Sequence, residues 1–547
     1  MRSGANFKQP PHYNETRESP KPKACQIVGI GASAGGLEAV QDLLIGLSTH
    51  TGMAFVLVQH LDPNHESRFA EILGRATKMP VAEVKGDTTI EPNHVYVIPS
   101  TASMIVENGK LKLLPREEGH ARPLVIDRFF SSLAKEQKHR AIGIILSGTG
   151  SDGARGIIEI RAEGGVTFAQ DKSAKQDGMP TAAIAGGSVD YILAPEGIAN
   201  ELFRLSQEPN QRVPGESSGT LLAILKVLRD STRADFSSYK KGTVTRRISR
   251  RMFLCKLEKL EDYLEYIKAN PSEISALHQD LLINVTSFFR DPEIFDVLKK
   301  DVFPLLIQGK SANRSLRVWV PGCATGEEVY SLAISLVEFV EDQKADVPVQ
   351  IFGTDISDTC VDRARVGEFA NASLAEVSPE RLRRFFLKTP TGYQINKSIR
   401  EKCVFAKHDV TQDPPFSGVD LISCRNLLIY LEAPLQKRVL SLFHYALKSD
   451  GILVLGGSEN IGAYGELFNT RDPKHKIFSR KVIAGHPHLG FTRGAAKQLR
   501  SEPDKKSESY SEPYDLSRDA DRAIAAKFGP QGVVINEAME ILQIRGK

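Results

Sequence analysis

Residues 26–40 read QIVGIGASAGGLEAV: a short apolar run, a glycine-rich turn and the start of an amphipathic stretch. A strand, a tight turn and a helix in this order are typical of an α/β fold with a parallel sheet. Ser33 lies at the centre of a G-x-S-x-G pattern in the turn. A nucleophilic serine can project there with little crowding, and the following helix N-terminus can offer N–H groups to an oxyanion. The stretch therefore predicts both the fold class and a candidate nucleophile.

The same turn also matches a dinucleotide-binding fingerprint, with Gly29, Gly31 and Ala34 in G-x-G-x-x-A spacing. A dinucleotide site needs an acidic residue at the end of the next strand to hold the ribose. The next apolar run, 54–59, is instead followed by His60. The pattern favours the serine, and a dinucleotide-dependent oxidoreductase remains an alternative.

Two further polar residues follow candidate strands. His60 ends the run AFVLVQH, and Asp152 follows the run 141–146 in a glycine-rich loop. Because parallel strands end at one edge of a sheet, Ser33, His60 and Asp152 could meet there as nucleophile, general base and orienting acid. A turn serine, a surface histidine and a turn aspartate are also common singly, so spacing alone leaves both interpretations open.

Short apolar runs alternate with amphipathic stretches up to about residue 205, which predicts a doubly wound parallel sheet. The predicted strands are 26–30, 54–59, 94–98, 141–146, 165–169 and 191–193, and two of the predicted helices are 37–46 and 66–73.

Residues 25–202 resemble the catalytic domain of the CheB chemoreceptor methylesterases. The resemblance lies in IGASAGG, VQHL, EPNHVYVIPS, LSGTGSDGARG and AQDKSAKQDGMPTAAIAGGSVDYIL. It implies that Ser33, His60 and Asp152 are the catalytic residues acting on γ-glutamyl methyl esters of receptor helices, and that glutamine deamidation is a possible second reaction. Ala34 and Thr149 depart from the residues common in the family. The 24 polar residues ahead of the domain cannot form the family's usual receiver domain, which argues against control by aspartyl phosphorylation in cis.

The second half of the chain is built around LRVWVPGCATGEEVYSLA at 316–333, another strand, glycine turn and helix. Acidic residues directly after the turn suit a cationic ligand better than a pyrophosphate. The next strand, in 349–353, leads to Asp355, where a carboxylate can accept hydrogen bonds from both ribose hydroxyls. An ordinary helix-capping aspartate is the alternative for that residue alone.

Residues 219–482 resemble the CheR chemoreceptor methyltransferases, through YKKGTVTRRISRRM, LLINVTSFFRDPEIF, GCATGEEVYSLA, FGTDIS, DLISCRNLLIYL and GILVLGGSENI. The resemblance implies a helical N-terminal subdomain, a Rossmann-like class I methyltransferase core with a small β-subdomain, and S-adenosylmethionine as the cofactor. By that resemblance the cofactor-contacting positions are Asn284, Thr286, Arg290, Glu327, Glu328, Asp355, Asp409, Val410, Arg425 and Asn426. Arg290 and Tyr430 would flank the methyl-transfer centre.

A basic stripe precedes this core, formed by Lys240, Lys241, Arg246, Arg247, Arg250 and Arg251. It could steer the acidic methylation region of a receptor helix or be a solvated helix face, and the sequence does not separate the two.

The segment 383–404, with a predicted hairpin at residues 391 and 392, matches the β-subdomain that docks receptor tails in some relatives. A glutamate acceptor is already an anion at neutral pH, so methyl transfer needs positioning rather than a strong base.

The remaining composition is that of an ordinary protein of 547 residues with a net charge of +4 and six scattered cysteines. It indicates no nucleic-acid partner, no disulfide framework, no metal site, no membrane insertion and a cytoplasmic location. The C-terminal stretch GPQGVVINEAMEILQIRG resembles the start of a PAS sensor domain, which could bind other signalling proteins. The predicted divisions are a tail at 1–24, a methylesterase domain at 25–205, a linker at 206–218, a helical subdomain at 219–292, a methyltransferase core at 293–485, a linker at 486–519 and a truncated PAS-like start at 520–547.

The sequence thus predicts a multifunctional chemotaxis enzyme that removes and adds methyl groups on chemoreceptor glutamates. A signalling scaffold that keeps the enzyme folds for binding receptors and partners is the main alternative. The residue types required for catalysis at Ser33, His60, Asp152 and Asp355 favour the enzyme.

Overall fold

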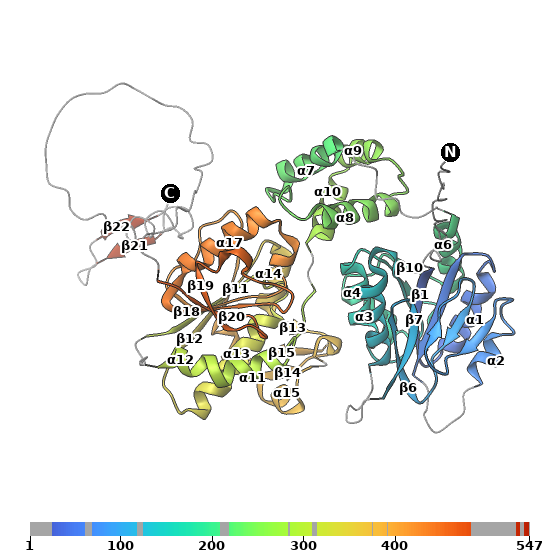
Figure 1. Ribbon diagram of the computed structural model, residues 1–547, viewed down its shortest axis with the longest axis horizontal. Coiled ribbons are helices and arrows are strands. Elements are labelled where there is room, and N and C mark those ends of the chain that lie inside the picture. The colour runs from blue at the N-terminus through green and yellow to red at the C-terminus, as the bar shows by residue number, and fades with distance from the viewer. Residues whose placement is uncertain are drawn as a thin grey trace, which may run out of the picture. The chain divides into compact units, whose positions relative to one another are not determined.

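The computed structural model describes residues 25–60, 68–116, 124–207, 218–282, 285–308, 314–374, 376–390, 392–482, 532–535 and 541–545. The described residues from 25 to 482 form one compact unit. It contains an N-terminal α/β domain, a helical subdomain and a second α/β domain (Figure 1). The predicted α/β fold class is confirmed, and the helical subdomain lies between the two α/β domains in the chain.

The N-terminal domain is a seven-stranded parallel sheet with strand order β10-β9-β8-β1-β2-β5-β3. Helices α1 and α6 pack on one face, and α3, α4 and α5 on the other (Figure 1). Its elements are β1 Gln26–Ala32, α1 Gly36–Gly46, β2 Met53–Gln59, α2 Phe69–Leu73, β3 Val81–Glu83, β4 Thr88–Thr89, β5 Val95–Val97, β6 Ala102–Glu107, β7 Lys110–Pro115, α3 Val125–Gln137, β8 Ile142–Ile145, α4 Ala154–Ala162, β9 Val166–Gln170, α5 Gly178–Ala185, β10 Tyr191–Leu193 and α6 Pro195–Gln207. All six predicted strands are present. The predicted start of α2 at residue 66 lies outside the described residues.

The strand order of this sheet reverses beside β1, because β2 follows it on one side while β8 lies on the other. Ligands of doubly wound sheets bind where the order reverses, at the carboxyl ends of the strands. Ser33 follows β1 and Asp152 follows β8, so both residues lie at this point of the fold. A small antiparallel sheet of β4, β7 and β6 flanks the domain and was not predicted.

The helical subdomain has four helices around its own apolar core. They are α7 Ser218–Thr232, α8 Lys241–Leu254, α9 Leu260–Ala269 and α10 Pro271–Leu281. The basic stripe lies on and beside α8. Pro271 in the first turn of α10 fits a helix start, because its missing N–H would have no partner there.

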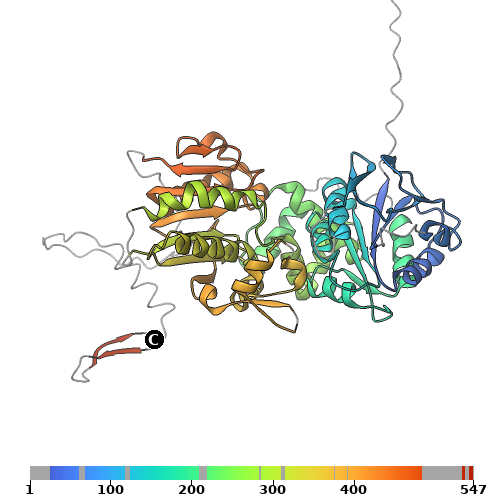
Figure 2. The same ribbon diagram turned by 90° about the horizontal axis from the view of Figure 1, so that it is seen from below.

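The second α/β domain has the strand order β16-β12-β11-β17-β18-β20-β19, in which the first five strands are parallel and the last two antiparallel. Helix α13 covers one face of the sheet and α17 the other (Figure 1), and Figure 2 gives a view of the same domain from below. The elements are α11 Glu293–Val297, a π-helical turn Leu298–Val302, α12 Phe303–Ile307, β11 Leu316–Pro321, α13 Glu327–Asp342, β12 Val349–Asp355, α14 Asp358–Val366, α15 Pro379–Phe385, α16 Lys397–Arg400, β16 Cys403–Lys407, β17 Val419–Cys424, α17 Ala433–Ala446, β18 Leu447–Leu455, β19 Phe468–Asp472 and β20 Ile477–Arg480. The order reverses beside β11, between β12 and β17, which again marks a candidate binding crevice.

A three-stranded antiparallel sheet projects from this domain and corresponds to the predicted β-subdomain. It consists of β13 Glu368–Phe369, β15 Tyr393–Ile395 and β14 Phe386–Lys388. The strands β14 and β15 pair antiparallel around the predicted hairpin position, of which residue 391 is outside the described residues. Near the C-terminus, β21 Gly532–Ile535 pairs antiparallel with β22 Ile541–Arg545. The rest of the predicted PAS-like segment lies outside the described residues.

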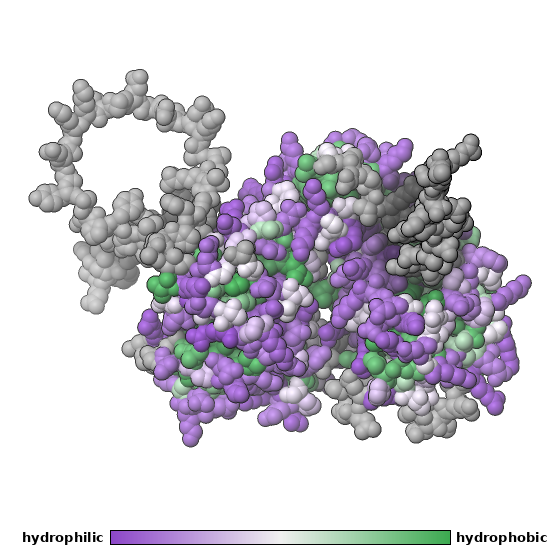
Figure 3. Space-filling model, viewed as in Figure 1, coloured by the Kyte–Doolittle hydropathy of each residue, from purple (hydrophilic) through white to green (hydrophobic). Residues whose placement is uncertain are grey.

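Hydrophilic side chains predominate on the face shown in Figure 3, and hydrophobic ones occur in small scattered groups. Among the described residues, no helix combines the length and the apolar character needed to cross a membrane.

Two of the six residues of the basic stripe, Arg247 and Arg250, are buried. Arg250 is 1% exposed and forms ion pairs with Asp190, directly before β10, and with Asp280 of α10. Arg247 is also buried and donates to the carbonyl oxygens of Arg161 and Ala162. Arg161 itself pairs with Asp280 at 2.8 Å. The middle of α8 therefore contributes to an internal ion-pair cluster. Only Lys240 and Lys241 of the stripe are exposed, so the stripe as a whole is neither a solvated helix face nor a surface open to a receptor.

Replacing Arg250 by methionine is expected to lower the free energy of unfolding by about 3–5 kcal/mol, because two buried carboxylates lose a shared cation. Denaturant unfolding followed by circular dichroism measures the change. The control is Arg246→Met, a partly exposed position on the same helix. Equal stability of the two variants would contradict the expectation.

Candidate active sites

Ser33 follows directly after β1, and helix α1 begins three residues later. Backbone hydrogen bonds hold the turn on both sides: the Ser33 N–H donates to the Ser147 carbonyl at 3.0 Å, and the Gly36 N–H donates to the Ser33 carbonyl at 2.9 Å. Gly35 has a φ of 72°, a conformation that favours glycine. The turn therefore presents the half-buried Ser33 side chain at the carboxyl edge of the sheet.

The glycines of β1 have a packing function that accounts for the dinucleotide-like pattern. A Cβ atom on Gly31 would lie 2.6 Å from the Ile126 side chain, and one on Gly29 would lie 2.9 Å from the side chains of Leu133 and Phe130. Helix α3 packs directly on the strand at these positions. The close packing of α3 therefore explains why these positions of β1 are glycines, and a dinucleotide site is not needed to explain them.

The structure brings Ser33, His60 and Asp152 together. His60 Nδ1 lies 3.3 Å from Ser33 Oγ, and His60 Nε2 lies 2.8 Å from Asp152 Oδ2. With its proton on Nε2, the imidazole donates to the aspartate and leaves Nδ1 free to accept from the serine hydroxyl. The His60 side chain is 24% exposed and that of Asp152 is 4% exposed, so a substrate can reach the base while its orienting acid stays buried.

Main-chain donors stabilise the buried carboxylate of Asp152. The N–H of Ile126 donates to Oδ2 at 3.0 Å, and the N–H of Asp127 donates to Oδ1 at 2.9 Å. Both donors belong to the first turn of α3, where the helix dipole favours a negative charge. The sequence did not point to α3 as a part of this site.

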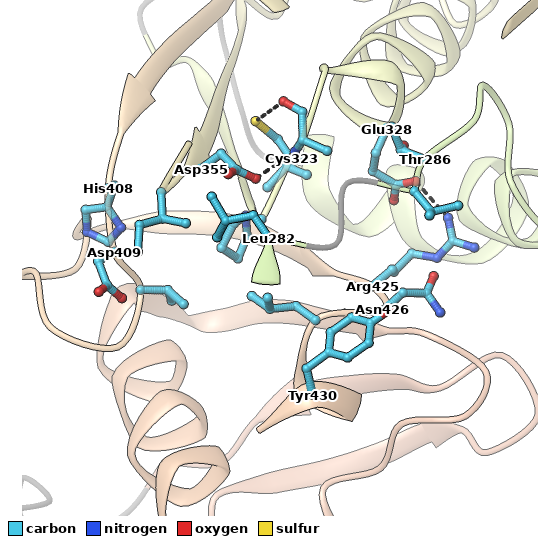
Figure 4. A pocket seen from close by; sticks show the side chains of 18 of the residues that line it. Leu282, Thr286, Cys323, Glu328, Asp355, His408, Asp409, Arg425, Asn426 and Tyr430 are labelled. Atoms are coloured by element: carbon cyan, nitrogen blue, oxygen red, sulfur yellow. Dashed lines mark hydrogen bonds and ion pairs between the residues drawn. The ribbon is translucent and has the colours of Figure 1, made fainter. Parts of the chain in front are cut away.

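The second candidate site is a pocket at the carboxyl ends of β11, β12 and β17, bordered by the helical subdomain. Among the predicted residues, those that line it are Thr286, Arg290, Glu328, Asp355, Asp409, Val410, Arg425, Asn426 and Tyr430. Asn284 lies outside the described residues. Figure 4 shows Asp355, His408 and Asp409 toward one end of the pocket, and Thr286, Glu328, Arg425 and Asn426 toward the other.

Asp355 ends β12 and is 7% exposed. Its Oδ2 accepts the Ala324 N–H at 2.8 Å, and its Oδ1 accepts the Ser357 N–H at 2.9 Å. The backbone donors leave lone-pair positions of the carboxylate for other donors. Burial raises the pKa of Asp355, and the backbone donors oppose this increase.

Arg425 links the two sides of the other end of the pocket. It donates to Glu328 Oε2 at 2.8 Å, to the Arg290 carbonyl at 2.8 Å and to Asp291 Oδ2 at 2.7 Å. Phe289 and Asp291 have positive φ values of 48° and 55°, which are uncommon for residues other than glycine. The guanidinium thus holds a strained loop, which carries Arg290, against the pocket.

The pocket lining offers unused polar atoms that fit a nucleoside-like ligand. Asn426 Oδ1 and His408 Nδ1 are buried without a hydrogen-bond partner, although both residues line the pocket. Buried polar groups usually have partners, so these two atoms indicate a ligand that supplies them. Together with Asp355 for hydroxyl groups and Glu328 for a cation, this set of groups fits S-adenosylmethionine.

Sequence reasoning missed several residues of the lining, among them Tyr239 and His408, whose side chains are polar. Tyr239 comes from the helical subdomain, and burial raises the pKa of its hydroxyl, with smaller contributions from the charges of Asp409 and Asp355. Tyr239 begins the stretch YKKGTV, in which the sequence analysis considered only the basic residues that follow it.

The adjacent glutamates 327 and 328 have different environments. Glu328 lines the pocket, whereas Glu327 is 5% exposed, is absent from the described lining and accepts a hydrogen bond from Thr325 Oγ1 at 2.6 Å. Burial raises the pKa of Glu327 to about 6. The prediction of Glu328 as a pocket residue thus fits the geometry better than that of Glu327.

The raised pKa of Glu327 predicts a pH-dependent stability. Between its usual pKa of 4.5 and about 6, the folded protein binds more protons than the unfolded chain. The stability contribution is thus fully present below pH 4.5 and is lost as the pH rises to about 6. Relative to wild type, the free energy of unfolding of Glu327→Gln should therefore rise by about 2 kcal/mol between those limits. Urea titrations across this range measure the difference, and Asp342→Asn, an exposed position, should show none.

Three family models match successive parts of the chain: "CheB methylesterase" at 28–202, "CheR methyltransferase, all-alpha domain" at 220–282 and "CheR methyltransferase, SAM binding domain" at 284–477. The first covers the domain that contains Ser33, His60 and Asp152. The third covers every residue that lines the pocket except Tyr239, Leu281 and Leu282, which lie before residue 284.

Three relatives illustrate the similarity. An uncharacterized 104.1 kDa protein of Rhodobacter capsulatus is 37% identical over 75% of this chain and 46% of its own length, so the chain spans about half of that protein. A putative methyltransferase, Cher3, of Pseudomonas putida is 36% identical over 45% of this chain and 91% of its own length. A protein-glutamate methylesterase/protein-glutamine glutaminase of Pseudomonas aeruginosa is 37% identical over 33% of this chain and 52% of its own length.

Among solved structures, the catalytic domain of the Thermotoga maritima CheB methylesterase matches with 28% identity and a TM-score of 0.32. The match covers 34% of this chain and all of that domain.

Proposed function

We propose that this chain, which belongs to the CheR methyltransferase family and carries a CheB methylesterase domain ahead of it, sets chemoreceptor methylation in both directions. The observation that carries the proposal is the pairing of two sites in one chain, the Ser33–His60–Asp152 cluster and the pocket around Asp355. The substrates are γ-glutamyl methyl esters for the first site and receptor glutamates for the second.

In the first site, Ser33 Oγ attacks the carbonyl carbon of the ester while its proton moves to His60 Nδ1. His60 then returns that proton to the departing methoxide, and methanol leaves an acyl-enzyme. A water molecule, deprotonated by His60, hydrolyses the acyl-enzyme and releases the glutamate. Asp152 would keep the ring oriented and stabilise the imidazolium, and N–H groups at the start of α1 would bind the oxyanion.

A glutamine side chain offers the same carbonyl carbon with ammonia as the leaving group. The name of the Pseudomonas aeruginosa relative includes protein-glutamine glutaminase. Deamidation by the same three residues is therefore the second reaction we propose for this site, with Ser33 again as the nucleophile.

In the second site, S-adenosylmethionine supplies an electrophilic methyl group on a sulfonium when it is bound. Asp355 would hold the ribose hydroxyls, the unpartnered Asn426 Oδ1 would accept from a ligand N–H or O–H group, and Glu328 would attract the cationic amino acid end. The residue at 284 belongs to the same proposal by resemblance. Arg290 and Tyr430 would aim the receptor carboxylate, whose ionised form needs no general base.

The test uses the protein with methyl-labelled S-adenosylmethionine and a chemoreceptor cytoplasmic fragment. Label should enter the receptor as a base-labile ester and leave it later as methanol. Incorporation without release would restrict the chain to methylation, and release from a pre-methylated fragment without incorporation would restrict it to hydrolysis. Neither reaction, with binding to the fragment retained, would favour the scaffold.

A further inference from the structure

Asp127 lies beside the methylesterase site on α3, and its side chain is buried. Its main-chain N–H holds Asp152 Oδ1, as described above. Its own carboxyl makes a different bond, because Asp127 Oδ1 accepts the N–H of Gly156 at 2.7 Å. One residue thus connects the carboxylate that orients His60 with the neighbouring helix α4.

Helix α4 begins at Ala154, two residues after Asp152, and its N-cap residue is Gly153. A glycine has no side chain to satisfy the free N–H groups of the first turn. Asp127, which belongs to α3, supplies the cap instead by accepting the N–H of Gly156. The position of the Ser151–Gly153 loop therefore depends on a bond made by a residue about 25 positions earlier in the chain.

Helices α3 and α4 are in close contact around the bond between Asp127 and Gly156. A Cβ atom on Gly153 would lie 2.8 Å from the Ile126 side chain of α3, and one on Gly156 would lie 2.3 Å from the Phe130 side chain of α3. A close-packed interior transmits displacements rather than absorbing them. A shift of α4 against α3 would accordingly move Asp152 relative to His60.

We propose that Asp127 is a positioning residue of the methylesterase: its N–H and its carboxyl together join the first turns of α3 and α4 into a clamp around Asp152. This inference deepens the proposed function of the Ser33 site and rests on it. Asp127 acts on His60 only through Asp152, so its effect is on the orientation of the base.

The charges around Asp127 make the clamp sensitive to pH. Burial and the neighbouring Asp152 raise the pKa of the Asp127 carboxyl well above its usual range, while the Gly156 N–H and Arg155 oppose the increase and Glu159 adds to it. Strands β1 and β2 beneath α3 contribute no ionisable group, and Glu107 of β6 lies toward the far end of α3, since the adjacent Val106 bonds Ser132. As the pH rises through this raised pKa, a second negative charge forms beside Asp152.

Repulsion between the two carboxylates would then loosen Asp152 from His60, so we expect methanol release to fall on the alkaline side. The test measures kcat/KM for a methylated receptor fragment with the full chain from about pH 6 to about pH 10. Asp127→Asn keeps an oxygen for the Gly156 N–H and cannot ionise, so it should stay within about threefold of wild type near pH 7 and lose the alkaline fall. Asp127→Ala lacks the acceptor and should be at least about tenfold slower at every pH.

Glu136→Gln, at the opposite end of α3, is the matched control and should keep the wild-type profile. An unchanged alkaline fall in Asp127→Asn, or a wild-type rate in Asp127→Ala, would overturn the proposal. A second readout does not need the enzymatic reaction: hydrogen exchange at the amide of residue 127, which donates to Asp152 Oδ1, should accelerate with rising pH more steeply in wild type than in Asp127→Asn. If the protein releases no methanol, the proposed function fails, and equal exchange in the two proteins would separately reject the clamp.

Discussion

Replacing Ser33 by alanine is expected to slow methanol release from a methylated receptor fragment by about 10⁴-fold or more. The reason is that His60 Nδ1, 3.3 Å from Ser33 Oγ, would have no nucleophile to deprotonate. Removing the nucleophile of a triad typically costs as much as removing the whole triad, because the members act as a unit. Labelled methanol collected from the pre-methylated fragment measures the rate directly.

The same Ser33→Ala protein should transfer label from S-adenosylmethionine to the receptor at the wild-type initial rate and retain more of it. Ser48→Ala, beyond the C-terminal end of α1, is the matched control and should release methanol normally. Methanol release that persists in Ser33→Ala would assign the hydrolysis to another group. A loss of both activities would indicate misfolding, which the unfolding curve of the variant would reveal.

Replacing Asp355 by alanine is expected to weaken the binding of S-adenosylmethionine by about 100-fold, or ~3 kcal/mol, through the loss of two charge-assisted hydrogen bonds to the ribose. The only tryptophan of the chain provides the readout. Trp319 is buried on β11, its indole N–H donates to Thr354 Oγ1 at 3.0 Å, and its ring packs edge-on against that of His408 in the pocket. Tryptophan fluorescence titrated with the cofactor therefore reports occupancy of the site.

Asp358→Asn serves as the comparison, because Asp358 is an exposed residue at the start of α14 that pairs with Lys407. It should bind the cofactor as wild type does. Asp355→Ala should keep the fluorescence spectrum of the free protein, which checks that β11 and β12 are intact. Wild-type affinity in Asp355→Ala would refute the assignment of the ribose to this carboxylate.

The sequence predicted the central strands well because buried parallel strands are nearly continuous apolar runs. The runs around β1, β2 and β8 stand out for this reason, and their carboxyl ends gather Ser33, His60 and Asp152 without any local contact among them. The β6–β7 hairpin escaped prediction, because its strands are only partly buried and β7 mixes lysines with apolar residues. Such short flanking strands depend on tertiary packing more than on pattern.

The sequence also could not show which of two neighbouring residues on one helix faces the pocket. Glu327 and Glu328 are chemically identical in the sequence, but successive positions on a helix differ by about 100° in direction. One therefore points into the protein and the other into the pocket. Asp127 illustrates the same limit, since an aspartate in the first turn of a helix is ordinary and its bond to Gly156 exists only after α3 and α4 have packed.

The ion pair between Asp190 and Arg250 has a consequence for synthesis on the ribosome. The two residues are 60 positions apart in the chain, so Asp190 is made several seconds before its partner at a typical rate of about 5–20 residues per second. During that interval the aspartate has Thr167 as a neighbour, whose N–H and hydroxyl both donate to it at 3.0 Å. The nascent N-terminal domain can therefore close its sheet before the arginine emerges, and the arrival of α8 then completes a charge cluster on a domain that has already folded.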